Sequence, residues 1–186
     1  IDKDANGSYE TSITLNEGGA TLVTGVSQGA RVQTTDEVKP IQVVLVTGDI
    51  GSSYESRDMN LLPVSAYGSS YWSPVGVNTG VAYTPGPTRV FLYSPSTGGP
   101  THITCKRRSP TPTTVTQAVS ARGIVTVDLN DNSGANCYAS NSSGAADTSK
   151  IIFAIGTIDT AVTGVSAGQA GDWSFTLYPD SFLSTD

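Results

Sequence analysis

The chain has 186 residues, a formal net charge of −6 and a sequence pI of about 4.6. This acidic balance argues against a nucleic-acid-binding protein, which needs a basic face. No apolar run approaches the ~18 residues of a membrane-spanning helix. Charged residues make up only 14% of the chain, below the roughly one quarter of typical soluble domains. Instead there are 23 Ser and 24 Thr, and such a hydroxyl-rich surface is common among extracellular β proteins. The length suits one domain or two very small ones.

The first residues, DKDANG (2–7), match the beginning of a calcium-binding EF-hand loop. Glu10 fits the ninth position of such a loop, but the twelfth, which needs a bidentate carboxylate, is Ile13. A second acidic stretch, 128–136, has its glycine one place late and Ala139 where the glutamate belongs. We therefore predict no metal site and no cofactor, and we interpret 2–7 as a polar, turn-forming leader. The absence of an initial Met and of a charged-then-apolar leader leads us to expect an exported, mature chain.

The segment SYETSITL (8–15) follows the leader and alternates between two faces. Tyr9, Thr11, Ile13 and Leu15 share one of them, which predicts a half-buried β-strand. The turn-forming residues NEGG (16–19) end it.

Further strands are predicted between clusters of Gly, Pro, Ser and Asn. Two of them, 41–46 and 150–155, are apolar on both faces, which favours central strands covered on both sides. Pro63 places another at an edge or a bulge. In chain order, the further predicted strands are 21–26, 41–46, 61–67, 88–93, a short strand at 102–105, 114–119, 124–129, 150–155 and 172–178. No segment keeps a helical period for three turns, so the pattern predicts a single all-β sandwich.

The cysteines, Cys105 and Cys137, predict a disulfide because the chain looks exported. Closing this loop would stabilise the fold by roughly 3–4 kcal/mol. Two buried thiols are the alternative, and two Cys with the single His102 are too few for zinc.

No catalytic signature is present. A hydrolytic triad needs a base, and His102 has no G-x-S-x-G motif to accompany it. On a strand, His102 and Cys105 would point to opposite faces. Sixteen acidic residues make chance carboxylate pairs certain, and no spacing selects one. We therefore predict that the protein is not an enzyme.

The stretch YGSSYWSP (67–74) places Tyr67, Tyr71 and Trp72 among small polar residues. Aromatic faces in such a loop stack on sugars or dock a partner, so these three are candidate ligand-binding residues. The alternative is that Trp72 fills the core and Tyr71 caps an edge. The basic cluster 106–108 is predicted to be a solvated loop.

The alternating N-terminal segment, the apparent export and the hydroxyl-rich surface resemble fimbrial pilins of the chaperone–usher type. The resemblance implies an incomplete immunoglobulin-like sandwich that a strand from a neighbouring subunit completes. Tyr9, Thr11, Ile13 and Leu15 would be the donor-strand side chains, with 1–16 as the extension and 17–186 as the sandwich. The C-terminal stretch 171–182 would bind an assembly chaperone. In the commoner pilins the Cys pair begins early in the domain, whereas here both cysteines lie in the second half.

The leading hypothesis is therefore a structural subunit of an extracellular fibre at the cell surface, polymerising with copies of itself or related subunits by strand exchange. The alternative is a monomeric adhesin or binding module for a host glycan or protein. A second alternative is a virion shell or tail component.

Overall fold

The protein is described by a computed structural model that covers most of the chain. The described residues are 1–36, 38–48, 56–74, 85–98, 101–108, 112–129, 133–160 and 173–183. By packing, the chain divides into two compact units, Ile1–Ile41 and Gln42–Asp186. The boundary predicted after residue 16 separates the proposed donor-strand extension from the sandwich. It stays a prediction.

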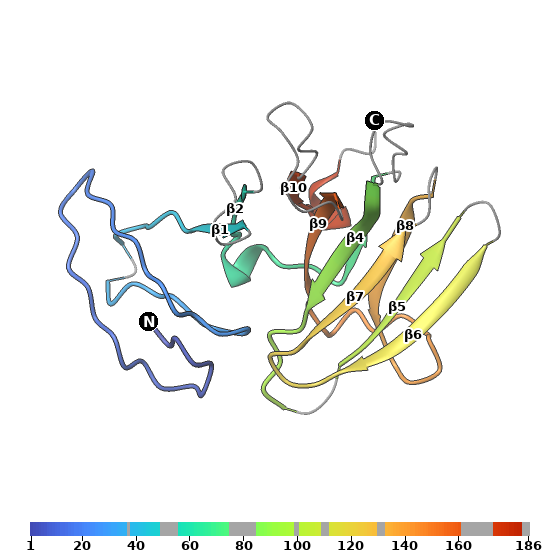
Figure 1. The fold of residues 1–186 in the computed structure, drawn as a ribbon. Helices are drawn as coiled ribbons and strands as arrows, with labels where there is room; N and C mark the ends of the chain where they lie inside the picture. Colours follow the sequence, from blue (N-terminus) through green and yellow to red (C-terminus); the bar gives the residue numbers. More distant parts are fainter. Residues whose placement is uncertain are drawn as a thin grey trace. The chain divides into compact units, whose positions relative to one another are not determined.

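The second unit is an all-β sandwich, as the sequence predicts (Figure 1). Its strands are β1 (Val44–Gly48), β2 (Ser56–Asn60), β3 (Ser70–Trp72), β4 (Pro85–Tyr93), β5 (Thr101–Arg107), β6 (Thr113–Val119), β7 (Ile124–Leu129), β8 (Ala135–Ser140), β9 (Phe153–Thr160) and β10 (Trp173–Thr176). No α-helix occurs among the described residues, which contain only the short 3₁₀ helices η1 (Val64–Ala66) and η2 (Asp180–Phe182).

Two four-stranded antiparallel sheets form the sandwich. One has the order β10-β9-β4-β7 and the other β3-β8-β5-β6, while β1 and β2 pair, among the described strands, only with each other. The alternation predicted for β7 is confirmed, because Val127 and Leu129 are buried whereas Thr126 and Asp128 are exposed. Strand β9 is central and buried on both faces along 153–157, apart from a half-buried Ile155, as its continuous apolar run predicts.

The core lies between the two sheets. It contains Tyr71, Val90, Leu92, Ile103, Cys105, Val119, Val127, Leu129, Ala135, Cys137, Ala139, Ile152, Ala154 and Leu177. The predicted disulfide is confirmed, since Cys105 of β5 and Cys137 of β8 are directly opposite each other and are bonded. It crosslinks two central strands of one sheet on the core side, so the thiols are neither free nor available to a metal.

The two sides of the sandwich differ. On one side, the chain after β10 crosses to the other sheet, where Pro179 forms a bridge with Tyr71, and Ile152 forms a bridge with Gly68. Ser174 and Thr176 of β10 also donate side-chain hydrogen bonds to backbone oxygens of β2. On the other side, β6 and β7 are the outermost strands, and no backbone hydrogen bond of the described residues joins their outer edges to another strand. The sandwich is therefore closed on one side and open on the other.

Five sequence predictions about secondary structure are wrong. Residues 8–15 and 21–26 form no strand within their own chain, and 61–67 contain the 3₁₀ turn η1 that follows Pro63. The run 41–46 is not central, because β1 pairs only with β2 and leaves Val44 and Val46 exposed. The basic residues 106–107 belong to β5 rather than to a loop, since both pair with β6 and β8.

The first unit is held by turns and local hydrogen bonds. Asp2 and Arg31 form a two-bond antiparallel bridge, with N···O distances of 2.8 and 2.9 Å. The amino group of Ile1 donates to the Thr11 carbonyl at 2.7 Å, so residues 1–11 close into a ring. Side chains within this ring accept hydrogen bonds from the backbone N–H groups of Lys3, Asn6, Gly7 and Ser8. Among the described residues, no strand pairs with 8–15.

Candidate functional site

The alternation of side chains along strand β3 determines whether Tyr71 or Trp72 is exposed to solvent. Successive side chains on a strand point to opposite faces. Tyr71 points into the core and is 1% exposed, whereas Trp72 points outward and is 46% exposed. The alternative in which Trp72 fills the core is therefore wrong, because the parity of β3 places Tyr71 there. Tyr67 is half-buried and its ring stacks on that of Phe153, with 4.8 Å between centroids.

The Tyr71 hydroxyl joins the two sheets from inside the core. It donates to the Ile152 carbonyl at 2.7 Å and accepts from the Gly68 amide at 3.0 Å. Burial raises the pKa of Tyr71 to about 12, with a smaller contribution from the negative charge of Asp180. Tyr71 has no surface to offer a ligand, so Trp72 is the only one of the three candidates that is exposed.

The predicted donor-strand side chains are mostly exposed in their own chain. Tyr9, Ile13 and Leu15 are 44%, 41% and 45% exposed, and Thr11 is half-buried. In the described part of the chain, no strand includes these four residues. Their apolar side is thus left without a sheet to cover it.

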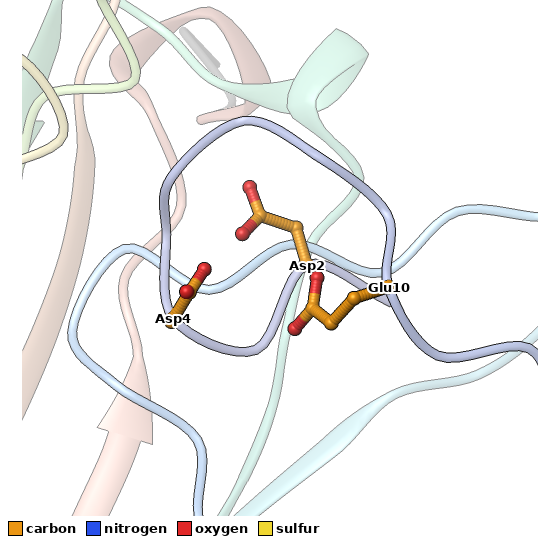
Figure 2. A group of neighbouring side chains, drawn as sticks. All are labelled: Asp2, Asp4 and Glu10. Atoms are coloured by element: carbon orange, nitrogen blue, oxygen red, sulfur yellow. The ribbon is translucent and has the colours of Figure 1, made fainter.

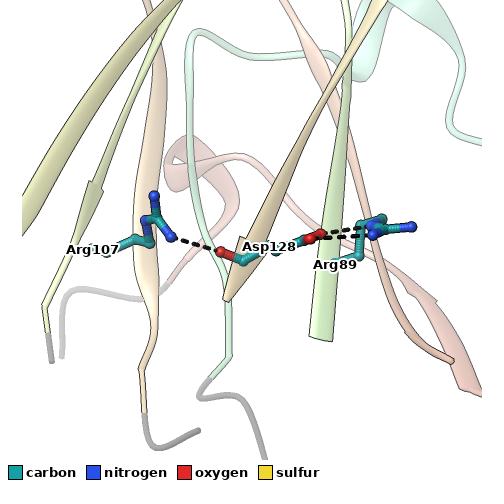
Figure 3. A network of polar contacts seen from close by, with 3 residues as sticks. All are labelled: Arg89, Arg107 and Asp128. Atoms are coloured by element: carbon teal, nitrogen blue, oxygen red, sulfur yellow. Dashed lines mark hydrogen bonds and ion pairs between the residues drawn. The ribbon is translucent and has the colours of Figure 1, made fainter. Parts of the chain in front are cut away.

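A groove lies on the open side of the sandwich, between its two outermost strands. Its volume is about 460 Å³, and its lining comes from both sheets: Arg89, Arg107, Val115, Gln117, Thr126, Val127 and Asp128. Figure 3 shows the polar contacts along it. Asp128 binds Arg89 through both carboxylate oxygens, at 2.6 and 3.1 Å, and Arg107 donates to the Asp128 carbonyl at 3.0 Å.

The hydrogen bond from Arg89 is the main reason why the pKa of Asp128 lies below its usual value. The carboxylate therefore stays ionised, and the groove carries two guanidinium groups against one carboxylate. The single excess positive charge favours an occupant with an acidic group.

Three carboxylates gather in the first unit, within the ring of residues 1–11 (Figure 2). Oxygens of Asp2, Asp4 and Glu10 lie within 4.8 Å of one another. Each carboxylate accepts a backbone N–H: Gly7 donates to Asp2 at 2.9 Å, Asn6 to Asp4 at 3.1 Å and Lys3 to Glu10 at 2.5 Å. These contacts explain the cluster as a set of loop-closing hydrogen bonds, and the prediction of no metal site stays a prediction.

Sequence analysis did not associate several residues on the same face with Trp72. Tyr178 and Phe182 come from the segment after β10, and Lys106 and Asn136 come from β5 and β8. Tyr178 and Phe182 are exposed, and their rings make an edge contact at 6.5 Å between centroids. Their proximity to β3 depends on the bridge between Tyr71 and Pro179, which no local pattern encodes.

Comparisons with family models, with curated proteins and with solved structures find no match for this chain. The disulfide indicates an extracytoplasmic environment, because thiols stay reduced in most cytosols. Within the described residues, no helix has the length and apolar character required to cross a membrane.

Proposed function

We propose that the protein is a structural subunit of an extracellular fibre, such as a fimbria or pilus, in which residues 8–15 of one copy pair with the open side of the next. The open-sided sandwich carries this proposal. The outer edge of β6, Thr113–Val119, offers a length of unpaired backbone that matches the eight residues of the segment. A strand added there would satisfy both backbones, which is the mode called β-augmentation.

Side-chain chemistry supports the same pairing. The segment brings exposed Tyr9, Ile13 and Leu15, and the groove beside β6 offers the apolar Val115 and Val127. Glu10 lies on the opposite, polar side of the segment and would stay in water when the apolar side is covered. The first unit is acidic as a whole, with six acidic and three basic residues in 1–41.

This contact is heterologous, since the donating and accepting surfaces differ. Repeating such a contact gives an open chain of subunits rather than a closed dimer. The role requires no catalysis, and it places the protein at the cell surface.

Assembly is tested by placing a charge on the donated side. We expect Ile13→Lys to abolish filaments seen by electron microscopy and to leave a monomer by size-exclusion chromatography, because the lysine would be buried in the neighbour's groove, which already carries excess positive charge. Leu22→Lys is the matched control, because Leu22 is 80% exposed and lies outside the donated segment, and it should assemble normally. Wild-type protein that stays monomeric at every concentration, or Ile13→Lys protein that forms normal filaments, would show that the segment is not exchanged.

A further inference from the structure

The outer face of the sheet β3-β8-β5-β6 carries a pair of exposed aromatic rings. Tyr71 and Pro179 form an antiparallel bridge, so their neighbours Trp72 and Tyr178 lie opposite each other. Both point outward, and they are 46% and 55% exposed. Phe182, 60% exposed, extends the group through its edge contact with Tyr178. Large rings left in water at a sheet edge mark an interaction surface.

A polar pocket continues this aromatic surface across the same face. Trp72 pairs in register with Asn136, and Asn136 pairs with Lys106, which places the three side chains in one outward row. From Trp72 to Lys106 the row spans two strand spacings, about 10 Å. The pocket has a volume of about 370 Å³. Its lining includes Ser70, Lys106, Asn136 and Tyr138 from the sheet, together with 144–146 from the loop after β8.

The charges on this face are basic, although the protein as a whole is acidic. Lys106 lies over the ring of Tyr138, with Nζ 5.3 Å from its centroid, and Arg108 lies 6.0 Å from the centroid of Trp72. No carboxylate of the described residues forms an ion pair with either cation. The two cations are therefore positioned by aromatic rings and are available to an anionic group of a ligand.

We infer that this face binds an oligosaccharide that contains a carboxylate-bearing sugar. The apolar face of one sugar ring would lie on Trp72 and Tyr178, as aromatic rings present a flat apolar surface beside polar groups. The next sugar would enter the pocket, where Asn136 and Ser70 contact hydroxyl groups and Lys106 binds the carboxylate. The inference goes beyond fibre assembly and does not depend on it, because the two surfaces use different residues.

Binding is tested by isothermal titration calorimetry with three acidic probes: tetragalacturonate, a hyaluronan oligosaccharide and sialyllactose. We expect saturable binding of at least one probe, and loss of at least about tenfold in affinity when its carboxylate is methyl-esterified, since charge-assisted hydrogen bonds carry that much. Binding of none of the three at about millimolar concentration, or equal binding of an acid and its methyl ester, would overturn the inference.

Three substitutions locate the site on this face. Trp72→Ala and Tyr178→Ala should each weaken binding at least about tenfold. Lys106→Gln should lower the affinity for the acidic probe and leave the affinity for its methyl ester unchanged. Lys39→Gln is the control, because it removes the same charge from a side chain that is 81% exposed in the first unit. All four positions are exposed, so the variants should fold. Unchanged affinity in Trp72→Ala, or an equal loss in Lys39→Gln, would contradict the proposed site. Filament formation by Ile13→Lys protein is a separate measurement, so the two proposals fail independently.

Discussion

Replacing Tyr71 by phenylalanine tests the contact that joins the two sheets inside the core. The substitution keeps the ring and removes the hydroxyl that accepts from Gly68 and donates to Ile152. The buried Ile152 carbonyl and the half-buried Gly68 amide would each lose this partner, which costs about 1–3 kcal/mol of unfolding free energy. Urea denaturation at pH 7, followed by circular dichroism, measures this loss.

The same variant also isolates the contribution of Tyr71 ionisation to stability at alkaline pH. The pKa of Tyr71 is about 12 in the folded protein against 10.0 ordinarily, so the native state keeps a proton that the unfolded chain releases. The associated stability is fully present below pH 10 and is lost as the pH rises through about 12. Two pKa units correspond to about 3 kcal/mol.

Wild-type protein should therefore lose more stability than Tyr71→Phe between pH 10 and pH 12. Other groups that titrate in this window are common to both proteins, and they cancel in the difference. The reasoning is refuted if the variant matches wild type at pH 7, or if both curves fall in parallel in alkali.

Three further predictions concern stability, and all are measured by the same urea titration. Reduction of the disulfide should lower the unfolding free energy by about 3–4 kcal/mol, because the unfolded chain regains the freedom of a loop closed across 32 residues; an unchanged midpoint in reductant would contradict this. Leu92→Ala should cost about 2–5 kcal/mol at a fully buried position, whereas Leu22→Ala should stay within about 0.5 kcal/mol, and similar losses would show that the core is misplaced. Gly156→Ala should cost about 1–3 kcal/mol, because a Cβ there would lie 2.3 Å from the ring of Phe175 on the adjacent strand. Trimming that ring with Phe175→Leu should recover part of the loss, and an additive double variant would exclude this clash.

Sequence patterns were sufficient to predict those strands of the sandwich that are half-buried or central. The alternation in 124–129 correctly identifies the core side of β7, and the apolar run 150–155 correctly predicts a central strand. The similar run 41–46 fails, because burial on both faces depends on neighbours. In the described part of the chain, strand β1 pairs only with β2, and nothing local distinguishes the two runs.

The aromatic surface could be predicted only in part. Composition singled out 67–74, but which of Tyr71 and Trp72 faces water depends on the position at which β3 enters the sheet. Tyr178 joins Trp72 through a bridge between segments more than a hundred residues apart, a separation that periodicity does not address. The strand predicted at 8–15 does not form within the chain. A strand needs a pairing partner, and the alternating pattern of the segment does not identify one.

The composition of β6 has a consequence for handling the protein. Its seven residues, TTVTQAV, contain no Lys, no Pro and no other residue of the kind that natural proteins use to discourage unwanted pairing. Solubility then depends on mutual repulsion between molecules, which disappears near the isoelectric point of about 4.6. Mild acidification should make the protein precipitate. Thr114→Lys, which places a charge on this edge strand, should keep it in solution under the same conditions.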